Sequence, residues 1–315
     1  MTKLSLACCL TLSFAVAWHA PDAAAIKVKR DRPGTAAQPE APKVDASKPA
    51  SAPPVPPPEL IKLTAAQIAD KNAAARGGLE AWRAVKTLAA SGQMEAGGKK
   101  NVQLPFALEM KRPHKQRLAL EFAGQTALQV FDGEKGWTLR PYLGRTEPEP
   151  FSPEERSKSA EQPDLDGPLI DYAVKGNKIE VEGTEAVEGK GTYRLKLTTK
   201  DGHAHHIWID GTTFLEAKIE GNPRRLDGKM HQVETYLRDY RSVDGLVIPF
   251  VSETKVQGMR ESHKMTFEKV VLNPPLDDGE FAKPHALASR PGGPASFVPA
   301  VSTQPPSPAV PANPQ

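Results

Sequence analysis

The sequence is poor in cysteine: its 315 residues contain two, Cys8 and Cys9, and both lie near its start. Without that segment, the chain has no disulfide, no thiol and no cysteine ligand for a metal. It also lacks a continuous apolar run of the roughly 20 residues that a membrane-spanning helix needs. The net charge is only +3, and basic and acidic residues are interspersed. No nucleic-acid partner is therefore expected, because such a partner needs basic residues clustered on one face.

The longest apolar run, residues 4–17, is too short to cross a bilayer and is followed by an Ala-x-Ala pattern that ends at Ala25. This arrangement is typical of a secretory signal peptide. We therefore interpret residues 1–25 as a signal peptide for export, with cleavage after Ala25, or after Ala17 as the alternative. A lipid anchor at Cys9 is less consistent with the pattern, because the apolar run continues past the cysteines.

Proline is unevenly distributed, and 17 of the 31 prolines lie in two stretches near the ends. Proline lacks the amide donor and fixes φ, so these stretches can form neither a helix nor a central strand. We predict a Pro/Ala-rich disordered linker over residues 26–59 and a Pro-rich disordered tail over residues 286–315. The alternative is that both are docking arms for a proline-binding or wall-associated partner. One domain, residues 60–285, remains, and it is large enough to bury a sizeable core.

Most of this domain alternates strictly between apolar and polar residues, which is typical of half-buried antiparallel strands. Asp-Gly pairs separate many of the alternating segments, and this pair favours tight hairpin turns. About a dozen strands joined as consecutive hairpins predict a mainly β fold, an incomplete, half-open antiparallel β-barrel. Its apolar concave face is predicted to be a ligand cavity lined by Phe106, Leu108, Met110, Leu118, Leu120, Phe122, Leu128 and Val130. Further along, the same alternation places Ile219 on the apolar face and Glu216 on the polar face.

Two segments are candidates to cover the concave face as an α-helical lid. The first begins with Thr64 and Gln67, which form a capping box, and it continues to an apolar stripe that includes Trp82. The second is the insert at residues 152–175, where Ser152 is a plausible helix start and a second short helix is expected to end at Gly176.

Two adjacent glycines, Gly77 and Gly78, interrupt the first of these helical segments. Each glycine inside a helix costs about 1 kcal/mol relative to alanine. We interpret the pair as a hinge, where the lid bends or its backbone approaches the sheet closely. The alternative is an ordinary helix end.

Several segments, taken in order, resemble the LolA/LolB-like family of periplasmic lipoprotein carriers. They read VKTLAASGQM, MKRPHKQRLAL, VFDGEKGWTLRP, DYRSVDGLVIPFV and LDDGEFAKP, and the resemblance covers residues 65–284. It implies a half-open barrel with a helical lid, an apolar cavity for acyl chains, a periplasmic location, no catalysis and no cofactor. The implied partners are lipid or lipoprotein acyl chains and a membrane-bound donor or acceptor protein.

The resemblance also implies a role for Arg112. In the family, an arginine of a Lys-Arg-Pro strand end bonds to the lid and couples its closure to cargo release, and residues 111–113 match this motif. The alternative is a solvated arginine at a strand end. The proline-rich ends and the insert at residues 152–175 are not part of a minimal carrier. A second hypothesis is therefore an envelope sensor or scaffold on the same fold, with the proline-rich ends as interaction arms.

Catalytic and metal-binding patterns are weak in this sequence. His203 and His205 are expected on one face of a strand, with His206 on the other, and two imidazoles still lack the further ligand that a zinc site needs. The sequence contains no HExxH, P-loop, dinucleotide fingerprint or G-x-S-x-G motif. We therefore expect a polar strand with no metal, and a non-catalytic protein, with a hydrolase as the remaining alternative.

Overall fold

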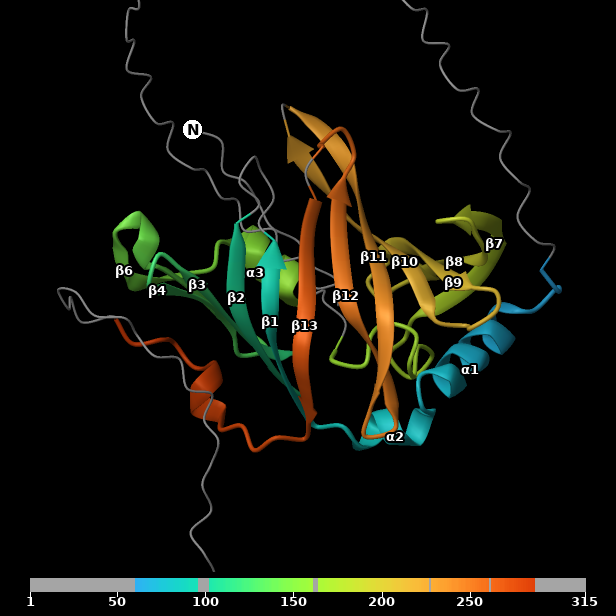
Figure 1. Ribbon diagram of the computed structural model, residues 1–315, viewed down its shortest axis with the longest axis horizontal. Coiled ribbons are helices and arrows are strands. Elements are labelled where there is room, and N and C mark those ends of the chain that lie inside the picture. The colour runs from blue at the N-terminus through green and yellow to red at the C-terminus, as the bar shows by residue number, and fades with distance from the viewer. Residues whose placement is uncertain (1–59, 96–101, 161–163, 227, 261, 287–315) are drawn as a thin grey trace, which may run out of the picture.

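A computed structural model describes residues 60–95, 102–160, 164–226, 228–260 and 262–286 of the chain (Figure 1). In these residues, 13 strands form one antiparallel sheet in the order β6-β5-β4-β3-β2-β1-β13-β12-β11-β10-β9-β8-β7. The strands are β1 (Thr87–Glu95), β2 (Gln103–Lys111), β3 (Lys115–Phe122), β4 (Gln125–Phe131), β5 (Gly136–Arg140), β6 (Arg145–Pro150), β7 (Lys178–Val187), β8 (Lys190–Thr198), β9 (Ala204–Asp210), β10 (Glu216–Leu226), β11 (Lys229–Val243), β12 (Leu246–Val256) and β13 (Ser262–Leu272).

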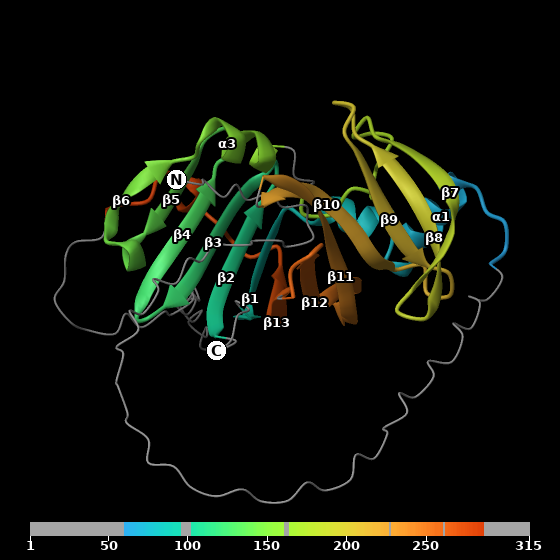
Figure 2. The same cartoon turned by 90° about the horizontal axis from the view of Figure 1, so that it is seen from above.

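The sheet curls but does not close, because its two edge strands, β6 and β7, do not pair with each other. Figure 2 shows these strands at opposite ends of the curved sheet. The chain between them, residues 151–177, contains the insert instead of a tight hairpin turn. The prediction of a mainly β, incomplete antiparallel barrel is therefore confirmed.

The hairpin turns follow the predicted Asp-Gly chemistry. At the turn between β11 and β12, Asp244 has φ 47° and Gly245 has φ 84°. Both central positions are thus left-handed, as a type I′ turn requires. Between β4 and β5, the Asp132 carboxylate accepts a hydrogen bond from the backbone N–H of Lys135 at 2.6 Å.

The helices are α1 (Ala65–Ala75), α2 (Leu79–Ala84) and α3 (Pro153–Ala160), with 3₁₀ turns at Pro141–Leu143 and Asp278–Phe281. The predicted capping box of Thr64 and Gln67 starts α1. The predicted start of α3 is also confirmed, because the Ser152 hydroxyl accepts from the N–H of Glu155 at 3.2 Å. The short helix expected to end at Gly176 was wrong: residues 165–176 form successive turns, since Asp171 has φ 53° and breaks the helical path.

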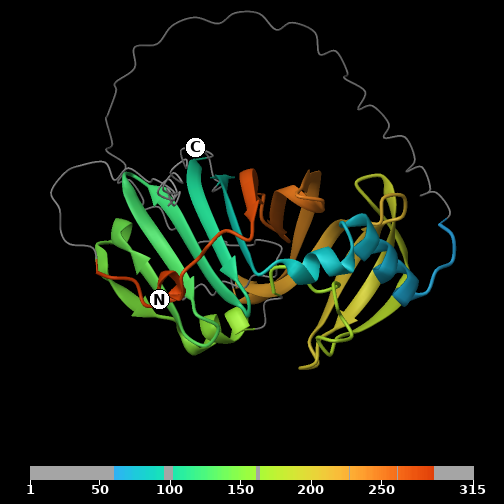
Figure 3. The same ribbon diagram turned by 90° about the horizontal axis from the view of Figure 1, so that it is seen from below.

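Two buried clusters occupy the concave face of the sheet. One lies over β1, β2, β3, β12 and β13 and includes Trp82 of α2 and Leu165 of the insert. The other lies over β8–β11 and includes Ile68 of α1 and Leu169 of the insert. Figure 3 shows α1 beside the β7–β9 part of the sheet and α2 leading from it toward β1. Helices and insert therefore both cover the concave face.

The register of β3 and β4 corrects two of the predicted cavity residues. Residues directly opposite each other on neighbouring strands lie on the same face of a sheet. Leu118 and Leu120 lie opposite Leu108 and Phe106, on the concave face. Across the next strand boundary, Leu128 lies opposite Ala119, and Val130 lies opposite Arg117. Leu128 and Val130 therefore belong to the convex face.

The convex face has a cover of its own, which explains why it also carries apolar residues. Lys111 points to this face, and its Nζ donates to the carbonyl oxygen of Leu276 at 2.7 Å. Asp278, in the 3₁₀ turn that follows, pairs with both Lys111 and Lys115 at 2.9 Å. The segment after β13 thus runs back along the outside of β2 and β3.

The described part of the chain contains no helix that is long and apolar enough to cross a membrane. The predicted signal peptide and linker lie outside the described residues, and so does the predicted tail apart from residue 286.

Candidate functional site

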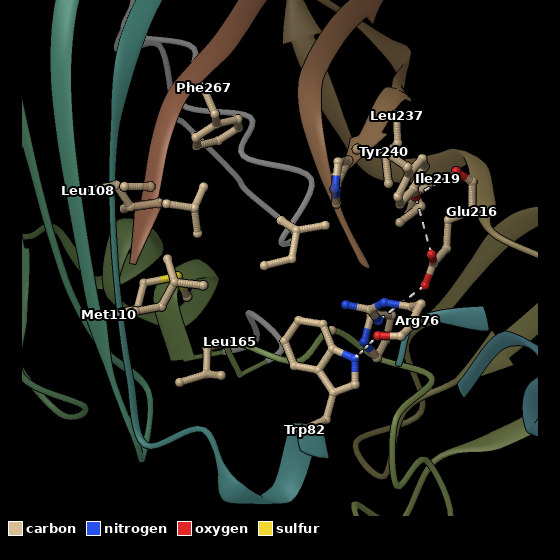
Figure 4. A pocket seen from close by; sticks show the side chains of 17 residues that line it. Arg76, Trp82, Leu108, Met110, Leu165, Glu216, Ile219, Leu237, Tyr240 and Phe267 are labelled. Carbon is tan, nitrogen blue, oxygen red and sulfur yellow. Dashed lines mark hydrogen bonds and ion pairs between the residues drawn. The ribbon is translucent and has the colours of Figure 1, made fainter. Parts of the chain in front are cut away.

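The concave face contains an apolar cavity of about 80 Å³ between the sheet and its cover (Figure 4). The sheet contributes Leu108 and Met110 from β2, Phe267 from β13, and residues of β1, β10, β11 and β12. The cover contributes Trp82 from α2 and Leu165 from the insert. Alternation in the strands explains this wall, because every second residue points inward.

The predicted cavity residues divide into groups. Leu108 and Met110 line the cavity directly. Phe106, Leu118 and Leu120 are buried in the same concave cluster, and Phe122 packs against its margin. Leu128 and Val130 are on the other face, as described above. Of the predicted cavity residues, those of β2 and β3 therefore lie on the concave face, and those of β4 do not.

Trp82 anchors the short helix α2 over the cavity. Its side chain is 1% exposed, and its Nε1 donates to the backbone oxygen of Arg76 at 3.0 Å. The guanidinium of Arg76 also lies over the Trp82 ring, 4.4 Å from the ring centre. This indole therefore joins α2 to the end of α1.

The two glycines lie at the junction of α1 and α2 and have different surroundings. Gly77 and Gly78 have φ of 103° and 98°, which side chains rarely adopt. A Cβ on Gly77 would lie 2.4 Å from the carbonyl oxygen of Gly245, whereas one on Gly78 would meet nothing within 4 Å. The backbone N–H of Val247 donates to Arg76 at 3.1 Å. The junction is thus attached to the β11–β12 hairpin, and Gly77 permits the close approach.

A buried polar cluster lies at one side of the cavity, and the sequence pattern does not reveal it. It consists of Arg76, Glu216 and Tyr240, and the first two are 7% and 5% exposed. Arg76 Nη1 lies 3.3 Å from Glu216 Oε1. The Tyr240 hydroxyl donates to the backbone oxygen of Glu216 at 2.8 Å. Burial raises the pKa of Tyr240 well above its ordinary value.

The position of Glu216 contradicts the simple alternation of β10. The strand has a bulge between Glu216 and Lys218. Glu216 consequently lies opposite Ile209, on the concave face, whereas Lys218 lies opposite Trp208 on the convex face. A bulge adds one residue to a strand, so the residues before it point to the face opposite to the one that alternation predicts. A carboxylate predicted to be on the polar face is therefore buried in the cavity wall.

Arg112, at the end of β2, connects the sheet to both parts of the cover. Its Nε donates to the backbone oxygen of Val85 at 2.9 Å, and its Nη2 to that of Trp82 at 3.3 Å. Nη1 and Nη2 also pair with the carboxylates of Asp164 at 2.7 Å and Asp166 at 2.8 Å. The planar guanidinium can satisfy several such acceptors at once. Arg112 thus contacts the end of α2 and the insert at the same time.

Asp166 is the central acceptor of this network. Its side chain is 3% exposed and also pairs with Lys175 at 2.5 Å, while its backbone oxygen accepts from Arg76 at 2.9 Å. Burial opposes the charge of Arg112, but the hydrogen bonds and charges of Asp166 and Asp164 raise its pKa above the ordinary value. Burial lowers the pKa of Lys175, and Asp166 offsets this only in part. The insert is therefore held to the barrel by charges that are largely shielded from water.

His205 and His206 of β9 point to opposite faces of the sheet, as the alternation predicts for a strand. His205 lies opposite Leu197 and faces inward, toward a polar cleft of about 910 Å³ that His203 also lines. His206 is on the convex face, where its Nε2 lies 3.0 Å from Glu182 and its Nδ1 contacts Glu220. Within the described residues, no group of three or more His, Cys, Asp or Glu is placed to hold a metal ion.

Solved structures similar to this chain include a LolA superfamily protein and a lipoprotein-sorting protein domain, at low sequence identity. A LolA superfamily protein from Nitrosomonas europaea is 14% identical, with a TM-score of 0.48, covering 70% of this chain and 99% of that one. A putative outer membrane lipoprotein-sorting protein domain from Vibrio parahaemolyticus is 14% identical, with a TM-score of 0.45, covering 69% and 95%. A DUF1329 family protein from Desulfovibrio piger is also 14% identical, with a TM-score of 0.48, covering 69% and 97%.

No family model matches the sequence, and no curated protein matches it. The TM-scores of the three solved structures lie below 0.5.

Proposed function

We propose that this protein is a non-catalytic carrier or binder of acyl chains, from lipids or lipoproteins, in the cavity between its open barrel and its cover. The observation that carries the proposal is an apolar concave face under a cover held at its margin by Arg112. Apolar walls with a few placed polar groups are typical of small-molecule sites. The proposed location is the periplasm, which rests on the predicted signal peptide at residues 1–25.

The size of the cavity implies that the cover moves when ligand binds. Typical ligand sites measure roughly 300–1,000 Å³, and this cavity measures about 80 Å³. An acyl chain of ordinary length therefore needs α2 or the insert to move away from the sheet. Arg112 joins both elements to β2, so we assign it the role of latch, with Gly77 and Gly78 as the hinge.

Acyl binding is energetically sufficient to drive this movement. Each buried methylene contributes about 0.8 kcal/mol, so the 14 to 16 methylenes of a long acyl chain supply about 11–13 kcal/mol. Part of this energy is offset by the cost of association and by the latch contacts that open. The remainder is consistent with roughly micromolar binding.

Two adjacent alanines of β1 give a matched test. Ala90 lines the cavity, and its neighbour Ala89 points to the convex face because alternate residues of a strand face opposite ways. Ala90→Phe should fill the cavity and reduce binding of a fluorescent fatty acid by about tenfold or more, whereas Ala89→Phe should leave it unchanged. Equal binding by a folded Ala90→Phe variant would refute the proposed site. Native mass spectrometry of the purified protein would identify lipid that remains bound.

A further inference from the structure

Three polar side chains interrupt the otherwise apolar lining of the cavity. Arg76, Glu216 and Tyr240 lie together at one side, facing Leu108 and Met110 across the cavity (Figure 4). Binding sites of this kind use a few polar groups to orient a ligand and select its chemistry. The cluster therefore bears on which class of acyl compound the site accepts.

The charges of this cluster are already balanced. Arg76 pairs with Glu216 at 3.3 Å, with both side chains less than a tenth exposed. The backbone oxygen of Asp166 also accepts from Arg76, at 2.9 Å. A ligand carboxylate placed here would face the Glu216 carboxylate at short range, where like charges repel strongly because little water screens them. The pair therefore disfavours a second negative charge.

One hydrogen-bond donor of the cluster has no partner. The Nε of Arg76 is buried and makes no hydrogen bond, although the residue is 7% exposed and lines the cavity. A buried donor without a partner is costly, and such groups in folded proteins call for an explanation. A neutral acceptor from a ligand would satisfy this donor without disturbing the ion pair.

We infer that the cavity selects acyl chains carried as esters or amides over free fatty acids, with the acyl carbonyl oxygen accepting from Arg76. This inference rests on the proposed function, since it concerns the same cavity. The carbonyl supplies an acceptor and no charge, and the chain beyond it lies against the apolar wall of β1, β2 and β13. Arg76 is next to the Gly77–Gly78 hinge, so movement of the cover exposes its guanidinium to an entering ligand.

The test compares two ligands of equal chain length, methyl decanoate and decanoic acid, at about pH 7.5, where a carboxylic acid is ionised. Each is used to displace a fluorescent acyl probe from the full-length protein. The wild type should bind the methyl ester at least tenfold more tightly than the acid. Glu216→Gln keeps the size of the side chain but removes its charge, leaving Arg76 positive. It should reverse the preference in favour of decanoic acid.

A double variant, Arg76→Met with Glu216→Leu, controls for the fold and for cavity shape. Replacing both members of a buried ion pair by apolar residues is often neutral for stability, and thermal unfolding verifies this. The double variant should still bind the probe, but it should lose the preference for a ligand that carries a carbonyl oxygen. Methyl decanoate and decane should then compete equally.

The outcomes separate this inference from the proposed function. If neither decanoyl ligand displaces the probe, and the probe itself binds equally to Ala90→Phe, the proposed function fails. If both ligands bind but the acid is at least as tight as the ester, and Glu216→Gln leaves the ratio unchanged, only the ester selectivity is overturned.

Discussion

Nη2 of Arg112 lies 2.8 Å from the carboxylate of Asp166, whose side chain is 3% exposed. The pair joins the end of β2 to the insert, and the same guanidinium holds two backbone oxygens at the end of α2. Since α2 and the insert both cover the cavity, one side chain contacts both covering segments.

We expect Arg112→Leu to bind acyl ligand at least as readily as the wild type but to release it more slowly. Hydrogen bonds to charged groups contribute about 1.5–3 kcal/mol each, so losing even one that favours the closed state should raise the apparent affinity by about tenfold or more. Stopped-flow association and dissociation rates of a fluorescent fatty acid measure this. Arg117→Leu is the control, because Arg117 pairs with Glu109 on the convex face. If Arg112→Leu bound and released the ligand at the wild-type rates, the proposed latch role of Arg112 would be wrong.

The two glycines should differ in their response to alanine. Gly78→Ala should cost about 1–3 kcal/mol, because only its positive φ is strained. Gly77→Ala should cost more, since its Cβ would also overlap the carbonyl oxygen of Gly245 at 2.4 Å. Urea unfolding of each single variant measures the difference. Equal costs would mean that the approach to the β11–β12 hairpin does not constrain Gly77.

Substitutions on the two faces of β3 and β4 should differ in their effect on acyl binding, although both should reduce stability. Leu120→Ala on the concave face should destabilise the fold by about 2–5 kcal/mol and also weaken acyl binding. Val130→Ala on the convex face should cost about 2 kcal/mol in stability and leave binding unchanged. Chemical unfolding combined with probe titration tests both. Weakened binding in Val130→Ala would contradict the face that the register assigns to it.

The contact between Arg83 and Asp171 should make the stability of the insert depend on pH. The hydrogen bonds from Arg83, at 2.6 and 2.8 Å, lower the pKa of Asp171. A carboxylate with a lowered pKa stabilises the fold above its unfolded value of about 3.9 and loses that contribution as the pH falls through the folded value. Wild type should therefore exceed Asp171→Asn in stability at neutral pH, and the difference should shrink below about pH 4.

Urea unfolding of both proteins across this pH range gives the measurement. The conservative Asp171→Asn change keeps the size of the side chain, so any difference that vanishes in acid reports the lost charge. A difference that stays constant down to pH values well below the ordinary range of a carboxyl would show that Asp171 acts through packing instead.

Much of the architecture follows from local sequence pattern. Alternation in β2 and β3 places Phe106, Leu108 and Leu120 on one face, and the Asp-Gly pair at residues 244–245 produces its turn. Both signals depend on neighbours in the chain, namely the two-residue repeat of a strand and the positive φ of a tight turn. They were sufficient to predict an open antiparallel barrel and the start of both covering segments.

The composition of the site depended on the tertiary structure. Alternation does not state which face of a strand is concave, and the register puts Leu128 and Val130 outside, on a face that has its own cover. A bulge turns Glu216 inward to meet Arg76 from α1. These residues are 140 positions apart, and only long-range packing brings them together, so no local pattern could have predicted the charged pair in the apolar wall.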